Sequence, residues 1–281
     1  MRKSTRTVKW LLPAMAALTA FLLAGPLQAG DLDAFRGLSG TLKISGGTAH
    51  IPVMKEAAKR IMRFNSSIRI TVAGGGSGVG IKQVGEGLVD IGNSGRKPTP
   101  AEIAKYDLKL FKWAVDGVAA VVNPRNPVRA LTAQQLREIF AGRIDNWKAV
   151  GGPDRGIDLY TRDKASGTRA VFWKKALARG PISPRANFVI SNGAMKAAVA
   201  GDPGAIGYVS VGYIDDGVAP VAIDGVRPTL ANVKSGRYPV ARGLYSNTRG
   251  EPRGLTRAFI DYLFSAEGQR IAADKGFIPV R

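Results

Sequence analysis

Short runs of β-branched and apolar residues alternate along this chain with longer segments in which apolar residues recur at helical spacing. Such alternation is typical of α/β domains with mainly parallel strands. It predicts strands over residues 41–45, 68–72, 89–93, 157–161 and 205–209. It predicts helices over residues 51–64, 78–86, 132–140, 167–177 and 193–199, with one or two more over 255–273.

One apolar run, residues 111–123, is too long for an average strand and ends before Pro124. We expect it to cross between two lobes. Because no repeat or low-complexity linker interrupts the chain, strand crossings rather than a flexible tether should join the lobes. We place lobe 1 in residues 30–115 plus 241–281, and lobe 2 in residues 116–240.

The first 29 residues have the pattern of a secretory signal peptide, with four basic residues before an apolar run that ends in small residues. We expect cleavage after Ala29. An uncleaved membrane anchor is the alternative, but the run is short, is interrupted by Pro13 and has no charge cluster after it. The mature protein should therefore be periplasmic.

The composition limits the available chemistry. The chain has no cysteine and one histidine, His50. It can have neither disulfides nor a cysteine for a lipid anchor, and it offers little for Cys-His or Ser-His catalysis or for a metal site. We therefore expect no cofactor. The net charge of +20 favours an anionic ligand, but the basic residues are too scattered to indicate nucleic acid.

Three segments place glycine and a hydroxyl between a predicted strand and helix. They are Gly46-Gly47-Thr48, Gly74 to Gly78 around Ser77, and Ala165-Ser166-Gly167-Thr168. A helix start offers unpaired N–H groups and a partial positive charge, and glycine lets an anion approach the backbone. One such loop is usually a plain helix cap. Three of them, with Arg162 four residues before Ser166, favour a small oxyanion.

Other uses of these loops fail on spacing. Ser77 is not a nucleophile elbow because Val79 stands where glycine is needed, and Lys82 is misplaced for a P-loop. The dinucleotide spacing is absent too. His50 could line the cleft, although a surface position is our default. For Asp90 and Asp116 we expect a structural role, as acceptors from turn N–H groups.

Five blocks of the sequence carry a likeness to a known family. They are LTAQQLREIFAGRIDNWKAVGG (131–152), TRDKASGTRAVF (161–172), GAIGYVSVGYI (204–214), YPVARGLY (238–245) and FIDYLFSAEGQRIAADKGFIPV (259–280). In these blocks the chain resembles the phosphate-binding proteins of phosphate ABC transporters, a type II periplasmic solute-binding family. The resemblance implies a two-lobed Venus-flytrap α/β fold that closes over phosphate, and a membrane permease as the partner. A monomer is expected.

The resemblance also implies the ligands. Thr48 would supply a hydroxyl and Ala49 a backbone N–H. Ser77 would be the ligand from the second loop, and Arg162 would be the cationic ligand. Ser166, Gly167 and Thr168 would supply hydroxyls and an amide from the third loop.

One position departs from the family pattern. The loop after the third strand carries an aspartate in well-known members, which accepts the proton of hydrogen phosphate, and here Gly95 stands there. Ser94 or a backbone amide could make that contact, and Arg96 could add charge. Discrimination against sulfate is therefore in question.

Three alternatives stay open at this stage. The first is a binding protein for another oxyanion, such as sulfate, molybdate or a phosphonate. The second is a secreted phosphatase-like hydrolase on the same scaffold. The third is an adhesive role for the basic exterior. The leading interpretation is reversible capture without bond breaking, and so no enzyme.

Overall fold

A computed structural model describes residues 30–281, and the predicted signal peptide lies outside the described residues. Residues 31–281 form one compact unit. Within the described residues no helix has the length and apolar character needed to cross a bilayer.

The strands of the described part are β1 (Gly40–Gly46), β2 (Ile68–Gly75), β3 (Ile91–Ser94), β4 (Leu108–Val122), β5 (Ala130–Leu131), β6 (Asp158–Thr161), β7 (Asn187–Phe188), β8 (Ala205–Ser210), β9 (Ala219–Pro220), β10 (Ala222–Ile223), β11 (Ala241–Arg249) and β12 (Ile278–Pro279). The α-helices are α1 (Ile51–Phe64), α2 (Ser77–Gly85), α3 (Pro100–Tyr106), α4 (Ala133–Ala141), α5 (Gly167–Lys175), α6 (Asn192–Gly201), α7 (Leu230–Lys234), α8 (Gly254–Phe264) and α9 (Ala266–Asp274). Short 3-10 helices are η1 (Asp33–Phe35), η2 (Thr48–His50), η3 (Trp147–Val150) and η4 (Val211–Tyr213). The elements predicted from the pattern are confirmed.

The pattern did not predict the short elements β5, β7, β9, β10, β12, α7 and η1 to η4, nor two longer ones, α3 and β11. Helix α3 is held by a capping box, in which the Thr99 hydroxyl accepts the N–H of Glu102 and the Glu102 carboxylate accepts the N–H of Thr99. That motif is visible in the sequence and could have revealed the helix. Strand β11 was also missed, and it proves central to the fold.

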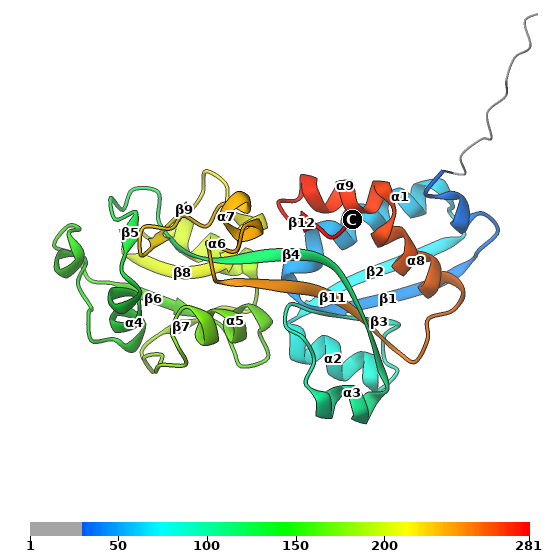
Figure 1. Ribbon diagram of the computed structural model, residues 1–281, viewed down its shortest axis with the longest axis horizontal. Coiled ribbons are helices and arrows are strands. Elements are labelled where there is room, and N and C mark those ends of the chain that lie inside the picture. Colours follow the sequence, from blue (N-terminus) through cyan, green and yellow to red (C-terminus); the bar gives the residue numbers. More distant parts are fainter. Residues whose placement is uncertain (1–29) are drawn as a thin grey trace, which may run out of the picture. The chain divides into compact units, whose positions relative to one another are not determined.

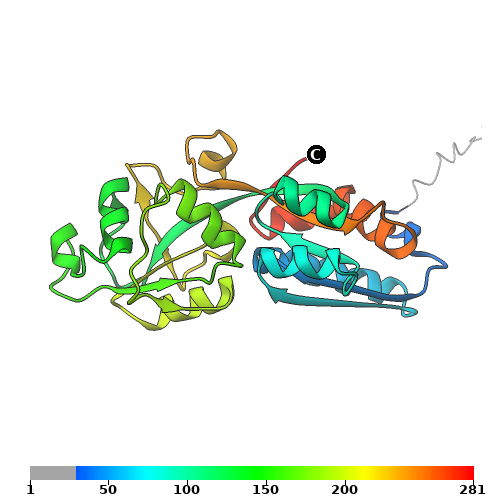
Figure 2. The same ribbon diagram turned by 90° about the horizontal axis from the view of Figure 1, so that it is seen from below.

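Strand β4 belongs to both halves of the sheet. Its first part pairs antiparallel with β11, from Leu108 opposite Arg249 to Gly117 opposite Ala241. Its last part, Val118 to Val122, pairs antiparallel with β8. The pairs β1–β2, β1–β3 and β6–β8 are parallel, as expected. The predicted crossing by residues 111–123 is therefore confirmed, and β11 returns beside β4 (Figures 1 and 2).

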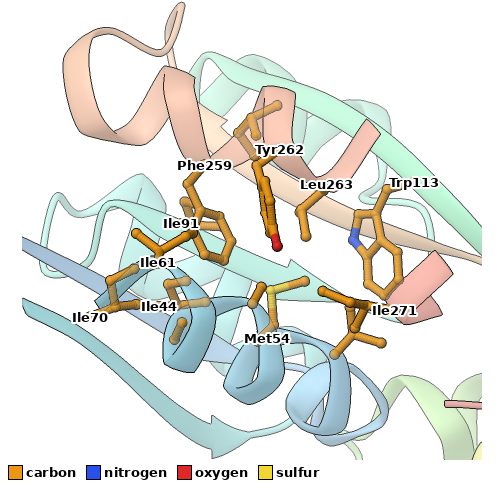
Figure 3. Close-up of a cluster of buried hydrophobic side chains, with 14 of the residues drawn as sticks. Ile44, Met54, Ile61, Ile70, Ile91, Trp113, Phe259, Tyr262, Leu263 and Ile271 are labelled. Atoms are coloured by element: carbon orange, nitrogen blue, oxygen red, sulfur yellow. The ribbon is translucent and has the colours of Figure 1, made fainter. Parts of the chain in front are cut away.

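Separate hydrophobic cores lie on the two sides of this crossing. The first gathers α1, α8 and α9 on β1 to β3, with Trp113, Met54 and Phe259 among its buried side chains (Figure 3). A smaller cluster beneath α2 and α3 covers the other face of these strands (Figure 1). We call this part lobe 1. The second core joins α4 and α5 to β6 and β8 around Phe140 and Phe172, and α6 packs on the opposite face; this part is lobe 2.

Candidate functional site

The three glycine-rich loops meet at one small cavity between lobe 1 and lobe 2. Its lining residues are Gly47, Thr48, Ala49, His50, Gly76, Ser77, Gly95, Arg162, Ser166, Gly167, Thr168 and Arg242. About 180 Å³ of space lies between their atoms. The cavity is small and its lining is rich in hydroxyls, backbone N–H groups and guanidinium groups, which suits a compact anion. All seven principal candidate residues are among the lining residues.

The first loop follows β1 and brings Thr48 to the start of η2. The Thr48 hydroxyl oxygen accepts two hydrogen bonds from Asn192 at the start of α6, one from its backbone N–H at 3.2 Å and one from Nδ2 at 3.0 Å. A threonine oxygen has two acceptor sites and one hydrogen. With both acceptor sites used, the Thr48 hydrogen is left to donate.

The second loop places Ser77 at the first position of α2. Gly75 and Gly76, with φ of 121° and 91°, make the turn that a side chain would strain. The buried Ser77 Oγ accepts the N–H of Gly95 at 2.9 Å, so its hydrogen is also free to donate.

The third loop caps α5. The Ser166 Oγ accepts the N–H of Arg169 at 3.1 Å, which is an N-cap bond. The Thr168 Oγ1 accepts from Nη1 of Arg242 at 3.1 Å and from Nδ2 of Asn192 at 3.4 Å. Gly167 lies between these hydroxyls, opposite Ser77. The helix start adds its own unpaired N–H groups.

Arg162 is the predicted cation, and its side chain is 1% exposed. Nη2 donates to the carbonyl of Ile190 at 2.9 Å, whereas Nε and Nη1 have no hydrogen-bond partner. Burial lowers the pKa of Arg162 from its ordinary value. Buried donors without partners are costly, and an anion in the cavity would satisfy them.

A second arginine, Arg242 on β11, lines the cavity and was missed by the sequence analysis. It stands opposite Asp116 in the β4–β11 ladder, and its Nε donates to Oδ2 of Asp116 at 2.8 Å. Asp116 also accepts the hydroxyl of Ser210 at 2.8 Å. Burial raises the pKa of Asp116, while Arg242 and Ser210 oppose that rise. The turn role expected for Asp116 is wrong, because this residue lies within a strand and holds an ion pair.

His50 is fully buried, so the default expectation of a surface histidine is wrong. Its ring packs edge-on against Trp113 at 5.6 Å between centroids, and Nδ1 lies 3.1 Å from the carbonyl oxygen of Gly47. Burial, helped by the nearby charge of Arg242, lowers the pKa of His50 to about 3. The imidazole is therefore neutral at physiological pH.

This burial predicts acid sensitivity. The folded pKa of about 3 lies below the ordinary 6.5, so the unfolded chain takes up the proton first and stability falls as pH drops from about 6.5 toward 3. The full loss from His50 is on the order of 4–5 kcal/mol. Urea unfolding at several pH values should show a shallower acid slope for His50→Gln than for wild type. Equal slopes would contradict this expectation, because other titrating groups are common to both proteins.

The residues flanking Gly95 do not line the cavity. The Ser94 hydroxyl oxygen accepts Nδ2 of Asn247 at 2.9 Å, and Arg96 forms a two-fold ion pair with Glu102 at 2.7 Å. Neither residue is among the cavity residues, so the proposed contacts from their side chains are wrong. Asp90 accepts the backbone N–H of Lys43 at 2.7 Å, a structural contact with a strand rather than a turn.

The two lobes touch directly around the cavity. The Tyr213 hydroxyl of lobe 2 donates to the carbonyl of Thr48 at 2.7 Å, and the Gly78 N–H donates to the carbonyl of Ala165 at 2.9 Å. Among the described residues no cluster of histidine and acidic groups could hold a metal ion. No carboxylate is among the lining residues. The arrangement offers donors and positive charge to a small anion.

Comparison with known proteins agrees with this geometry. The family described as "PBP superfamily domain" matches residues 36–267. The chain is 40% identical to the phosphate-binding protein PstS of Bacillus subtilis, over 95% of this chain and 93% of that protein. It is 30% identical to PstS of Borreliella burgdorferi, over 85% of this chain and 90% of that protein.

Solved structures give the same answer. A phosphate ABC transporter substrate-binding protein of Clostridium perfringens, crystallised with bound phosphate, matches with TM-score 0.81 and 34% identity, covering 86% of this chain and all of that one. An ABC-type phosphate transport receptor of Vibrio cholerae matches with TM-score 0.68 and 33% identity, covering 84% and 99%. The resemblance stated from the sequence blocks and the two-lobed fold are confirmed. The chain belongs to the PBP superfamily and, within it, to the family of ABC-transporter phosphate-binding proteins.

Proposed function

We propose that this protein captures inorganic phosphate between its lobes outside the cytoplasm and delivers it to the permease of an ABC transporter. The observation that carries the proposal is the buried Arg162, whose Nε and Nη1 have no partner beside a cavity lined with hydroxyls. Relatives at 40% and 30% identity bear the name phosphate-binding protein, which supports phosphate as the ligand.

In this proposal phosphate is held by the residues that the family resemblance implied. Hydroxyls, backbone N–H groups and one guanidinium surround it, from Thr48, Ala49, Ser77, Arg162, Ser166, Gly167 and Thr168. Charge-assisted hydrogen bonds contribute about 1.5–3 kcal/mol each. Because the donors come from both lobes, only the closed form makes all of them, and phosphate shifts the population toward closure.

Closure is the signal that a permease would read. We propose the lobe limits 30–115 with 241–281 and 116–240, with bending where β4 and β11 cross. The protein would act as a monomer after removal of residues 1–29. Light scattering on the secreted protein and its N-terminal sequence would test these two points.

A secreted hydrolase on the same scaffold is less well supported. Ser77 and Ser166 accept hydrogen bonds from backbone N–H groups, and within residues 30–281 neither has a basic side chain as a hydrogen-bond partner. His50 directs Nδ1 to a backbone carbonyl. Phosphatase activity that disappears in Ser77→Ala would be needed to favour the hydrolase.

Two measurements test the proposed function. Isothermal titration of the mature protein with phosphate should give tight one-to-one binding without turnover. Expression of the full chain in cells that lack their own phosphate-binding component, together with its matching permease, should restore phosphate uptake. Absence of phosphate binding would contradict the proposed capture. Binding without uptake would contradict only the proposed delivery to the permease.

A further inference from the structure

Arg242 occupies the space beside Gly95. A Cβ placed on Gly95 would lie 2.6 Å from Nη1 and 2.9 Å from Cζ of Arg242, closer than side-chain carbons approach other atoms. Nη1 also lies 3.3 Å from the Gly95 carbonyl oxygen. The guanidinium therefore stands where any side chain at position 95 would have to go. The cavity has a cation at this point, and an acidic residue at 95 could not be added without moving it.

The hydroxyls around the cavity are set to donate. Thr48 and Thr168 each already accept two hydrogen bonds, and Ser77 and Ser166 each accept one. Every one of these hydroxyls keeps a hydrogen to give. A proton carried by the ligand would find only neutral oxygen lone pairs as acceptors, because no carboxylate is among the lining residues.

The charges facing the cavity are also fixed over a wide pH range. Arg162 and Arg242 are cations. Two carboxylates lie close by without lining the cavity: Asp116 is the ion-pair partner of Arg242 at 2.8 Å, and Asp163 accepts the backbone N–H of Ser166 at 3.0 Å. His50 stays neutral because burial lowers its pKa to about 3. Tyr213 stays protonated because burial raises its pKa to about 12. The residues that line the cavity thus carry positive charge and no negative charge at any physiological pH.

From this we infer that Arg242, anchored on Asp116, is a second cationic ligand that makes the cavity select its anion by charge rather than by a proton. The inference rests on the proposed capture of phosphate and specifies the ionisation state in which phosphate binds. Phosphate binds as the dianion, and sulfate, a tetrahedral dianion without a proton, competes for the same place.

Titration calorimetry with phosphate and with sulfate, at about pH 8 and about pH 5, tests the inference. We expect sulfate to bind within about tenfold of phosphate at the higher pH. At the lower pH phosphate should weaken by more than about tenfold as the monoanion takes over, while sulfate is unchanged. Sulfate weaker than phosphate by about a thousandfold, or phosphate affinity independent of pH, overturns the inference.

Variants separate the role of Arg242 from folding. Arg242→Met alone would leave the buried Asp116 charge without its ion-pair partner and could unfold the protein. The double variant Asp116→Asn with Arg242→Met is therefore the one to measure. We expect it to lose about thirtyfold or more in affinity for both dianions, with Arg249→Met, an exposed arginine on the same strand, as the matched control. Unchanged affinities in a folded double variant overturn the inference. Sulfate binding without phosphate binding in wild type would sink the proposed function instead and leave the role of Arg242 standing.

Discussion

Replacing Arg162 with methionine lowers phosphate affinity by about a hundredfold to ten-thousandfold. Two of its guanidinium nitrogens are buried without partners, and each charge-assisted bond to the anion would contribute about 1.5–3 kcal/mol. Calorimetric titration of the secreted variant measures the loss. Lys164→Met is the matched control, because Lys164 is exposed two residues further along the same loop and should leave the affinity unchanged.

The same change should leave the ligand-free protein at least as stable as wild type. The lowered pKa of Arg162 reports that its charge is disfavoured where it lies. A thermal melt without phosphate should therefore show an equal or higher midpoint for Arg162→Met. A lower midpoint, or an affinity within tenfold of wild type, would show that Arg162 supports the fold rather than the ligand.

Gly167→Ala should impair closure almost as severely. A Cβ on Gly167 would lie 2.0 Å from Oγ of Ser77 and 3.2 Å from the carbonyl carbon of Gly95, both in the opposite lobe. The clash exists only when the lobes meet, so each lobe should fold normally while phosphate affinity falls by about a hundredfold or more. X-ray scattering should show that added phosphate no longer compacts the variant.

The matched control is Gly201→Ala, at the end of α6, where a Cβ would meet nothing within 4 Å. It should bind phosphate as wild type does. Compaction of Gly167→Ala by phosphate, at wild-type affinity, would mean that the loops can shift enough to remove the contact.

Local signals account for the part of the fold that could be predicted. The helix over residues 51–64 was predicted with both ends correct, because its apolar residues repeat at helical spacing. The helix after Thr132 begins with a capping box, in which Gln135 returns the bond. The three loops were found because glycine beside a hydroxyl at a helix start is a pattern within a few residues.

Contacts between distant segments account for the rest. Arg242 reaches the cavity because β11 pairs with β4 in one register, and nothing near position 242 in the sequence records that register. The burial of His50 likewise depends on Trp113, which comes from another strand. Asn192, which bridges Thr48 and Thr168, was not singled out for the same reason. Long-range pairing of this kind leaves no local periodicity to read.

The ladder formed by β4 and β11 affects both the rate at which the lobes close and the affinity for the anion. Two segments hydrogen-bonded to each other cannot wander independently, so the opposing loops meet after bending along few directions instead of searching freely in three dimensions. Little orientational entropy is then lost when the two lobes close. Most of the interaction free energy with the anion can appear as affinity, and the closing step need not be slow.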